Sequence, residues 1–174
     1  NDGGANVTYD GGLSWSTQSN QPTAEIYRVE VDNQFPYKVY GCQQDNSSIA
    51  ISSQGNPRQH FESVGGGESG HIAVDPRNPD IIYAGNYIGI LTRLNNETGH
   101  IKSINAYPEL HDAIAGRDLK YRFQWNYPIR ISPHDPDILY ITSTISCCNS
   151  KLCYSIFQIK QKILHFSKYT ILSP

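Results

Sequence analysis

The chain has 174 residues, of which 38% are hydrophobic and 17% are charged, so it can bury an ordinary globular core. Its formal net charge is −2, and its 14 lysines and arginines form no dense stripe, which excludes nucleic acid and anionic membranes as expected partners. No stretch reaches the roughly 18 apolar residues that a transmembrane helix needs. The chain opens at Asn1 and contains no methionine, and we expect it to be a piece of a longer polypeptide.

A turn motif stands near the start of the chain. It matches the pattern Ser/Thr-x-Asp-x-Gly-x-Ser/Thr-Trp with Thr8, Asp10, Gly12, Ser14 and Trp15. The Asp10 carboxylate can accept backbone N–H bonds of its own turn, glycine permits positive φ, and Trp15 supplies a large apolar anchor. The motif resembles the Asp-box of bacterial neuraminidase-repeat propellers. This resemblance implies a structural hairpin away from the ligand face, and therefore a structural rather than a catalytic Asp10.

A phrase of twelve residues follows three times, at 29–40, 72–83 and 129–140. Each copy begins with two alternating apolar residues, has a middle rich in Asp, Asn and Pro, and ends in branched or aromatic residues, which predicts strand, turn, strand. Pro36, Pro79 and Pro136 occupy the same slot. The copies start 43 and 57 residues apart, and the blades of known propeller repeats take about 40 to 50 residues each.

The remaining pattern is one of strands and loops. The expected strands are 27–31, 38–42, 48–52, 71–74, 81–84, 89–94, 101–104, 128–131 and 138–142. Residues 95–99 form a good hairpin turn, and the only expected helix is a short one at 109–116, inside the longer second interval.

Three further phrases, at 43–46, 65–70 and 118–125, look like those of large sortilin-type or glycosyl-hydrolase-like repeat proteins. With the repeats and the Asp-box, they make residues 1–144 similar to a partial propeller. The resemblance implies an all-β fold, a β-propeller fragment of about three four-stranded blades. Because closed propellers usually have four to eight blades, the remaining blades of a longer chain are an expected partner.

The composition changes at about residue 145. All glycines and acidic residues precede this point, and 145–174 contains four lysines. We expect this atypical C-terminal extension to lie outside the propeller, either as a foreign segment or as a short amphipathic one with Lys on its polar side. Of the four cysteines, Cys42 falls in the repeat sequence and is expected to be a small buried hydrophobe.

The glycine-rich segment 65–71 suggests a loop with functional groups. A phosphate-binding loop is excluded because a strand pattern, not a helix, follows it. Its order of residues also misses the nucleophile elbow. What remains is a flexible loop that presents Glu68, Ser69 and His71 at a channel mouth, or alternatively a loop whose glycines only satisfy turns.

Residues 120–126 interleave aromatic side chains with cationic and amide ones. As a strand, this segment would place Tyr121, Phe123 and Trp125 on one face and Arg122 and Gln124 on the other. The aromatics then either pack into the core or form a sugar platform, with Arg122, Gln124 and Trp125 as substrate contacts.

Glycoside hydrolysis would need two carboxyl groups about 5 to 10 Å apart. Asp45, Glu68 and Asp118 are the acids in the suspected channel loops, and Gln43, Gln44 and His71 are further candidates for binding substrate. Acids of the repeated turns are expected to be structural; they are Asp32, Asp75, Asp80, Asp135 and Asp137. The histidines lack ligand spacing, so neither a metal nor another cofactor is predicted.

Two functions follow from the resemblance. One is a secreted carbohydrate-active propeller that resembles glycosyl hydrolases; the other is a non-enzymatic sortilin-like propeller that binds peptides or proteins. Whether the chain is an enzyme stays open, because propellers host many functions. The resemblance and three sequons, at Asn6, Asn46 and Asn96, suggest an extracellular or periplasmic location.

Overall fold

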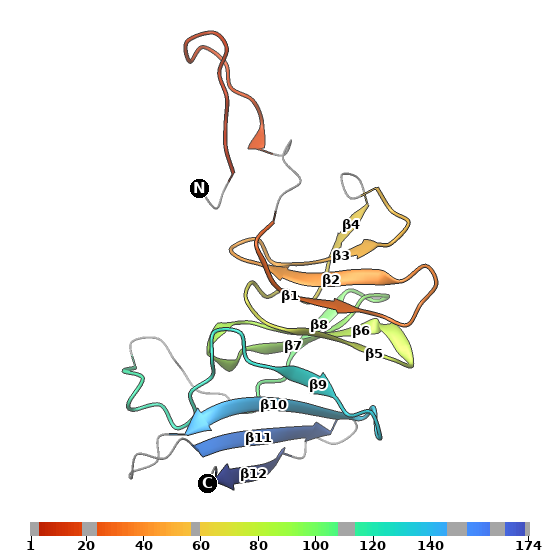
Figure 1. Cartoon of the computed structure of the whole chain (residues 1–174), viewed down its shortest axis with the longest axis vertical. Helices are drawn as coiled ribbons and strands as arrows, with labels where there is room; N and C mark the ends of the chain where they lie inside the picture. The colour runs from red at the N-terminus through yellow and green to blue at the C-terminus, as the bar shows by residue number, and fades with distance from the viewer. Residues whose placement is uncertain are drawn as a thin grey trace.

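The structure, a computed structural model, describes residues 4–18, 24–56, 60–107, 114–145, 153–160 and 166–172. It is all-β, and three antiparallel sheets of four strands follow one another along the chain and stack in that order (Figure 1). Sheet 1 comprises β1 (Ile26–Val31), β2 (Lys38–Gln43), β3 (Ser48–Ser52) and β4 (Phe61–Ser63). Sheet 2 comprises β5 (Ile72–Asp75), β6 (Asn78–Gly85), β7 (Leu91–Asn95) and β8 (His100–Ser103), with the 3-10 turn η2 (Tyr87–Gly89) after β6. Sheet 3 comprises β9 (Ile129–Ile131), β10 (Ile138–Ile145), β11 (Cys153–Lys160) and β12 (Phe166–Leu172).

The twelve-residue phrase forms the first two strands of every sheet. Its copies supply β1 and β2, β5 and β6, and β9 and β10, as the strand–turn–strand pattern predicted. The register is also repeated, because Val31 pairs with Val39, Val74 with Ile82, and Ile131 with Leu139. In the part of the chain that the structure describes, no helix is long and apolar enough to cross a membrane.

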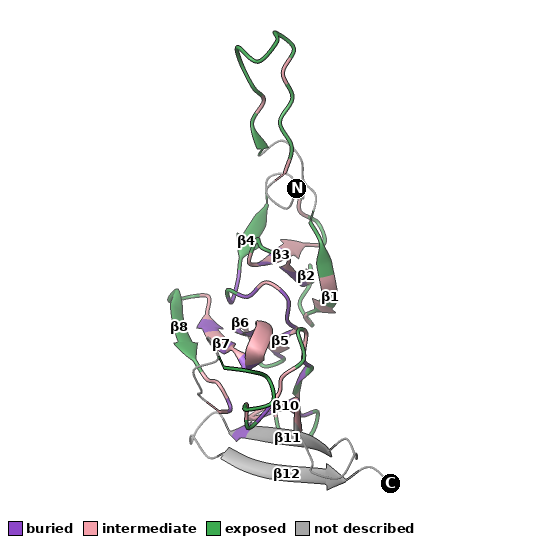
Figure 2. Cartoon of the chain, turned by 90° about the vertical axis from the view of Figure 1, so that its left-hand side faces the viewer, coloured by how far each residue is buried: buried purple, intermediate pink, exposed green. Residues whose placement is uncertain are grey.

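Two apolar layers hold the three sheets together. Between sheets 1 and 2, Tyr40, Cys42 and Ala50 pack against Ile72, Ile82, Ala84 and Leu94. Between sheets 2 and 3, the layer includes Ala73, Tyr83, Leu91, Ile129, Leu139, Ile141 and Ile159. Figure 2 shows the buried positions gathered where the sheets meet. Because strand side chains alternate between faces, each sheet can contribute to the layer before it and to the layer after it.

All the strands expected from the sequence are present, with ends shifted by at most three residues. The hairpin turn at 95–99 joins β7 to β8, and Gly99 adopts a φ of +69° there. The sequence did not predict β4. This strand has only three residues and all of them are exposed, so it is too short to show an alternation of apolar and polar residues. Most of the expected helix at 109–116 lies outside the described residues, and 114–116 form no helix.

The expectation that residues 145–174 lie outside the repeated sheets is wrong for their two described segments. β10 itself extends to Ile145, β11 pairs with it from Ile138–Lys160 to Ile145–Cys153, and β12 pairs with β11. Ile159 is buried in the core layer opposite Leu139. The composition misled because glycine and acidic residues mark turns and loops, whereas a strand ladder is made by backbone groups that every non-proline residue carries.

The hairpin that carries the Thr8–Trp15 motif stands apart from the three sheets (Figure 1). Asp10 accepts hydrogen bonds from the Ser14 N–H at 2.9 Å, the Ser14 hydroxyl at 2.5 Å and the Thr8 hydroxyl at 2.8 Å. These bonds lower the pKa of Asp10 to about 2, with the Ser14 hydroxyl as the largest cause. The predicted turn chemistry is therefore confirmed. Trp15 does not act as an anchor here, because 61% of it is exposed and the hairpin projects away from the cores.

The repeated turns use their polar residues locally, as predicted. In the fourth slot of the phrase, Asp32, Asp75 and Ser132 each accept a bond from the backbone N–H two residues later, at 2.9 to 3.3 Å. Asp135 accepts the Asp137 N–H in the same manner at 3.0 Å. Such side-chain bonds satisfy a turn without help from another element.

Candidate functional site

Among the described residues, four connections lie at one end of the sheets, and we call them together the loop edge. They are residues 44–47 between β2 and β3, 64–71 between β4 and β5, 86–90 between β6 and β7, and 114–128 before β9. They lie toward the left in Figure 1, whereas the repeated turns lie toward the right. The predicted site residues all belong to the loop edge or to the strand end that enters it: Gln43, Gln44, Asp45, Glu68, His71, Asp118, Arg122, Gln124 and Trp125.

Glu68 connects two parts of the loop edge. Its Oε2 accepts a hydrogen bond at 3.0 Å from the backbone N–H of Asp45, a residue with a φ of +58° in the turn between β2 and β3. The N–H of Glu68 donates in turn to Asn86 Oδ1 at 3.5 Å. Two of the three predicted catalytic acids are therefore neighbours, and Glu68 stabilises the turn that carries Asp45.

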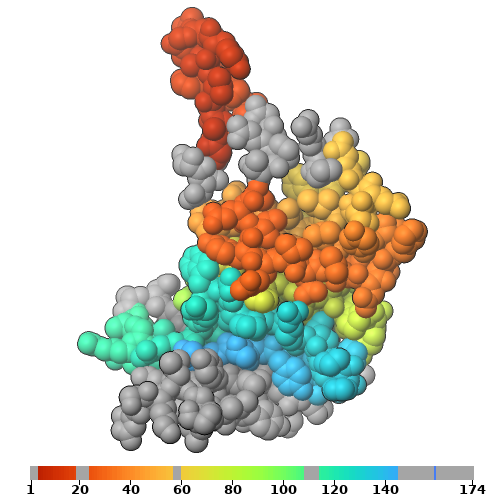
Figure 3. Space-filling view, viewed as in Figure 1, coloured from red at the N-terminus to blue at the C-terminus, as the bar shows by residue number. Residues whose placement is uncertain are grey.

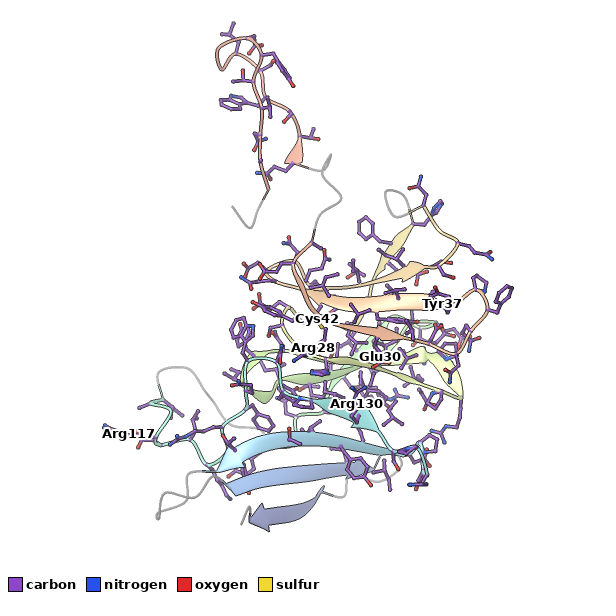
Figure 4. All side chains as sticks on the ribbon, viewed as in Figure 1. Arg28, Glu30, Tyr37, Cys42, Arg117 and Arg130 are labelled. Atoms are coloured by element: carbon purple, nitrogen blue, oxygen red, sulfur yellow. The ribbon has the colours of Figure 1, made fainter. Side chains whose placement is uncertain are left out.

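Asp118 is not part of this arrangement. Its side chain is exposed, and its closest charged neighbour is Arg117, with Arg117 Nε and Asp118 Oδ2 3.7 Å apart. Figure 4 shows Arg117 on an outlying loop, well separated from Arg28 and Cys42. The structure thus brings Asp45 and Glu68 together but leaves Asp118 apart.

The glycine segment is tightly packed rather than flexible and open. A Cβ on Gly67 or Gly70 would lie 2.3 or 2.2 Å from the Gly85 carbonyl oxygen, and one on Gly65 would lie 2.4 Å from Ala84 Cβ. Glycine is therefore required because the loop backbone presses against the end of β6. Ser69 is completely buried and donates to the Trp125 carbonyl oxygen at 3.1 Å.

Trp125 is the most accessible aromatic of the 120–126 segment. Its ring stacks on Tyr87 with 5.4 Å between centroids and 13° between planes, and 45% of the residue is exposed. Tyr121 and Phe123 instead pack with the core layer between sheets 2 and 3. The segment forms only one bridge, from Arg122 to Thr144, so the expected continuous strand is wrong. Without strand alternation, Trp125 separates from the two core aromatics.

The other predicted substrate contacts differ in burial and in hydrogen bonding. Gln43 Nε2 donates to the Asn46 carbonyl at 3.2 Å, and Gln44 Oε1 accepts from the Tyr27 hydroxyl, so local bonding explains both glutamines. Gln124 is exposed. Arg122 Nε is buried and has no hydrogen-bond partner among the described residues. The backbone of Arg122 makes two bonds of 2.8 Å with Thr144, which fix this segment to β10.

The first strands of the three sheets border a groove of about 230 Å³. Arg130 of β9 and Glu30 of β1 form an ion pair across it at 3.1 Å, and Figure 4 shows both side chains among β1, β5 and β9. His71 lies where β5 leaves the loop edge. Burial, followed by the charges of Arg28 and Arg130, lowers the pKa of His71, so its neutral form is favoured.

Sequence reasoning missed three residues of the loop edge. Asn86 Oδ1 accepts the Tyr87 N–H at 2.8 Å and so positions the ring on which Trp125 stacks. Tyr127 is completely buried and donates to the Ile90 carbonyl at 2.6 Å. The repeat held a signal for Asn86 and Tyr87, because residues 86–87 follow the second phrase at the positions where Gln43 and Gln44 follow the first. Among the described residues, no group of three His, Cys, Asp or Glu side chains is arranged to hold a metal ion.

No protein-family model and no curated protein matches the chain. Among solved structures, a crystal structure of Citrobacter koseri AztD is 15% identical, with a TM-score of 0.49 over 87% of this chain and 36% of that one. A structure of apo AztD from the same organism gives 15% identity and a TM-score of 0.48 over 87% and 35%. The chain therefore spans about a third of the length of these proteins, and likenesses this weak carry no information about its ligand.

Proposed function

We propose that this chain forms three blades of an exported Asp-box β-propeller and that its loop edge binds a carbohydrate. Three features support the propeller: four-stranded antiparallel sheets in chain order, the same phrase at the start of each, and connections of alternate type gathered at opposite ends. In such an architecture, loops on a rigid scaffold are the usual place for binding groups.

The observation that carries the binding proposal is the stacked pair of Trp125 and Tyr87. Trp125 is half-exposed, so one aromatic surface is available to the apolar face of a sugar ring. The Ser69 hydroxyl donates to the Trp125 carbonyl, and Asn86 Oδ1 accepts both the Tyr87 N–H and the Glu68 N–H. These contacts place an amide side chain and the backbone of an acidic residue beside the pair. Hydroxyl groups of a sugar would bond to such groups, whereas the rings would supply most of the contact area.

Binding is a better-supported function than hydrolysis. Hydrolysis would need a second carboxyl beside Glu68, and Asp45, the one acid of the predicted set that contacts Glu68, does so through its backbone N–H and not through its carboxylate. In this proposal Glu68 orients the turn and contacts ligand, and the pair Glu68 and Asp45 is the one to test for catalysis.

The two tryptophans of the chain provide a matched test. Trp125→Ala and Trp15→Ala each remove one exposed indole, but Trp15 lies on the separate Asp-box hairpin. Calorimetric titration with a panel of neutral oligosaccharides should show binding that is roughly tenfold or more weaker in Trp125→Ala and unchanged in Trp15→Ala. Equal affinities in all three proteins, or no binding of any oligosaccharide, would refute the carbohydrate proposal.

The same proteins test the sortilin-like alternative. Binding of a peptide library without any binding of oligosaccharides would favour a peptide receptor. If the wild-type chain released product from aryl glycosides and Glu68→Gln did not, the chain would be a hydrolase and not only a binding protein.

A further inference from the structure

The structure separates the three sequons of the chain, which begin at Asn6, Asn46 and Asn96. In N-glycosylation the side-chain amide of the Asn receives the glycan, and the Ser or Thr hydroxyl two residues later completes the recognised sequon. Both groups therefore have to be accessible, and the folded chain must have room for a bulky glycan.

The sequon at Asn6 holds the N-terminal hairpin together. Asn6 Nδ2 donates to the Ser16 carbonyl oxygen at 2.6 Å. The Thr8 hydroxyl donates to Asp10 Oδ1 at 2.8 Å and accepts the Gly12 N–H at 2.9 Å. A transferase would have to open the hairpin to reach these groups.

The sequon at Asn46 belongs to the loop edge. Asn46 Nδ2 donates to the Gln44 carbonyl oxygen at 3.1 Å. Ser48 is completely buried, and its hydroxyl donates to the Gly67 carbonyl oxygen at 2.8 Å. This hydroxyl joins β3 to the glycine segment and is therefore inaccessible in the folded chain.

The sequon at Asn96 leaves its polar side chains available. It lies in the turn between β7 and β8, where Asn95 Oδ1 accepts the Thr98 N–H at 3.2 Å and the Asn96 N–H donates to the Asp80 carbonyl oxygen at 2.7 Å. Among the described residues, neither the Asn96 side-chain amide nor the Thr98 hydroxyl has a hydrogen-bond partner. The backbone of the turn is therefore fixed, while both groups of the sequon face no competing contact.

The turn also has space for a glycan. Residues 97–99 and all four residues of β8, the outer strand of sheet 2, are exposed (Figure 2). Sheet 2 lies between sheets 1 and 3 (Figures 1 and 3), so further blades would be added beyond those two sheets and not over this turn. Because β6 ends at the loop edge and β7 returns from it, the turn lies at the opposite end of the sheet, and a glycan there leaves the loop edge open.

We propose that Asn96 is the N-glycosylation site of the exported chain and that the fold selects it over Asn6 and Asn46. In the reaction, Asn96 Nδ2 forms a bond to the anomeric carbon of an oligosaccharide carried on a lipid diphosphate. The bond from that carbon to the diphosphate oxygen breaks, the lipid diphosphate leaves with the electron pair, and the amide nitrogen loses one proton. The inference rests on the export of the chain in the proposed function and is independent of carbohydrate binding at the loop edge.

Expression of the full chain with an added leader in eukaryotic secretory cells tests the site. Peptide N-glycosidase in heavy-oxygen water converts each glycosylated Asn to a labelled Asp, and mass spectrometry then gives the occupancy of every sequon. Asn96 should be occupied, and Asn6 and Asn46 should be roughly tenfold less occupied, because their native bonds have to open first. The chain inside the cells is measured as well as the medium, so a chain that is retained still gives a result.

Two substitutions at Thr98 provide a matched control. Thr98→Ala removes the hydroxyl and should abolish the glycan, whereas Thr98→Ser keeps a hydroxyl and should retain it. A wild-type chain without a glycan on Asn96, or with equal occupancy at all three sequons, would overturn the proposal. Occupancy is measured without any ligand, so an occupied Asn96 in a chain that binds no oligosaccharide would refute the carbohydrate proposal alone.

Discussion

The connections at the two ends of the sheets satisfy their polar groups in different ways. At the end of the repeated turns, Asp32, Asp75 and Ser132 satisfy their own turns, each with a bond to the N–H two residues later. At the loop edge, the bonds of Glu68 and Ser69 join connections of different sheets. A turn whose hydrogen bonds are local can have the same pattern in every sheet. A loop that packs against a neighbouring loop needs different residues in each sheet. The loop edge is therefore where a specific site can be built.

The first test of this difference is to add a single methyl group to a closely packed glycine of the loop edge. In Gly70→Ala the new Cβ would lie 2.2 Å from the Gly85 carbonyl oxygen, which is backbone and cannot move aside as a side chain could. We expect the free energy of unfolding, measured by urea denaturation, to fall by about 3 kcal/mol.

Gly116→Ala is the control for this change, because its Cβ would meet no atom within 4 Å. If Gly70→Ala were as stable as Gly116→Ala, the glycine segment would be a loose loop after all, as the sequence first suggested.

The second test concerns the turn end, where Arg77 makes one contact beyond its own turn. It bonds to Asp75 at 2.9 Å and to Asp137 of the next sheet at 2.8 Å. Arg77→Ala should lower the free energy of unfolding measurably, because Asp75 is buried and loses a charged partner. Arg117→Ala should have almost no effect, since Arg117 and Asp118 form a pair in solvent.

The cost of Arg77→Ala should depend on pH. Burial raises the pKa of Asp75, but the hydrogen bonds and charge of Arg77 outweigh it, and the pKa is lowered. The stabilisation is then fully present above the ordinary carboxyl pKa of about 4 and is lost as the pH falls through the lowered value. Urea denaturation at several pH values should show wild type and Arg77→Ala converging in acid. A constant difference would mean that the ion pair is not its cause.

The smallest expected effect is that of Glu68 on the turn beside it. Glu68→Ala removes the acceptor of the Asp45 N–H and should cost about 1 kcal/mol, whereas Glu68→Gln keeps an oxygen there and should cost less. Hydrogen exchange of the Asp45 amide reports this contact directly, and Glu97→Ala, in the exposed turn after β7, is the control. Equal exchange in all variants would show that Glu68 does not hold the turn, which would leave ligand contact as its only role.

The sequence predicted most strands because alternating apolar residues and turn-forming Asp, Asn, Pro and Gly are local signals. It also predicted that the acids of the repeated turns are structural, and Asp32, Asp75 and Asp135 each accept a bond from the backbone N–H two residues later. It failed for β11 and β12, because the lack of turn-forming glycine and acidic residues in 145–174 was interpreted as a lack of strands. It failed again at 120–126, because alternation there implied a strand that forms a single bridge to Thr144.

At the candidate site, the sequence identified polar and aromatic residues but not their arrangement. Which of them meet depends on packing between sheets: the approach of the glycine segment to Gly85, the bond from Ser69 to Trp125, and the stacking of Tyr87 on Trp125. These contacts join residues 15 to 56 positions apart, and no local pattern encodes them. By itself the sequence determined that the chain forms strands with repeated, self-satisfied turns, because those depend on neighbouring residues. The tertiary structure alone decided which loops meet, because sheet packing brings together residues that lie far apart along the chain.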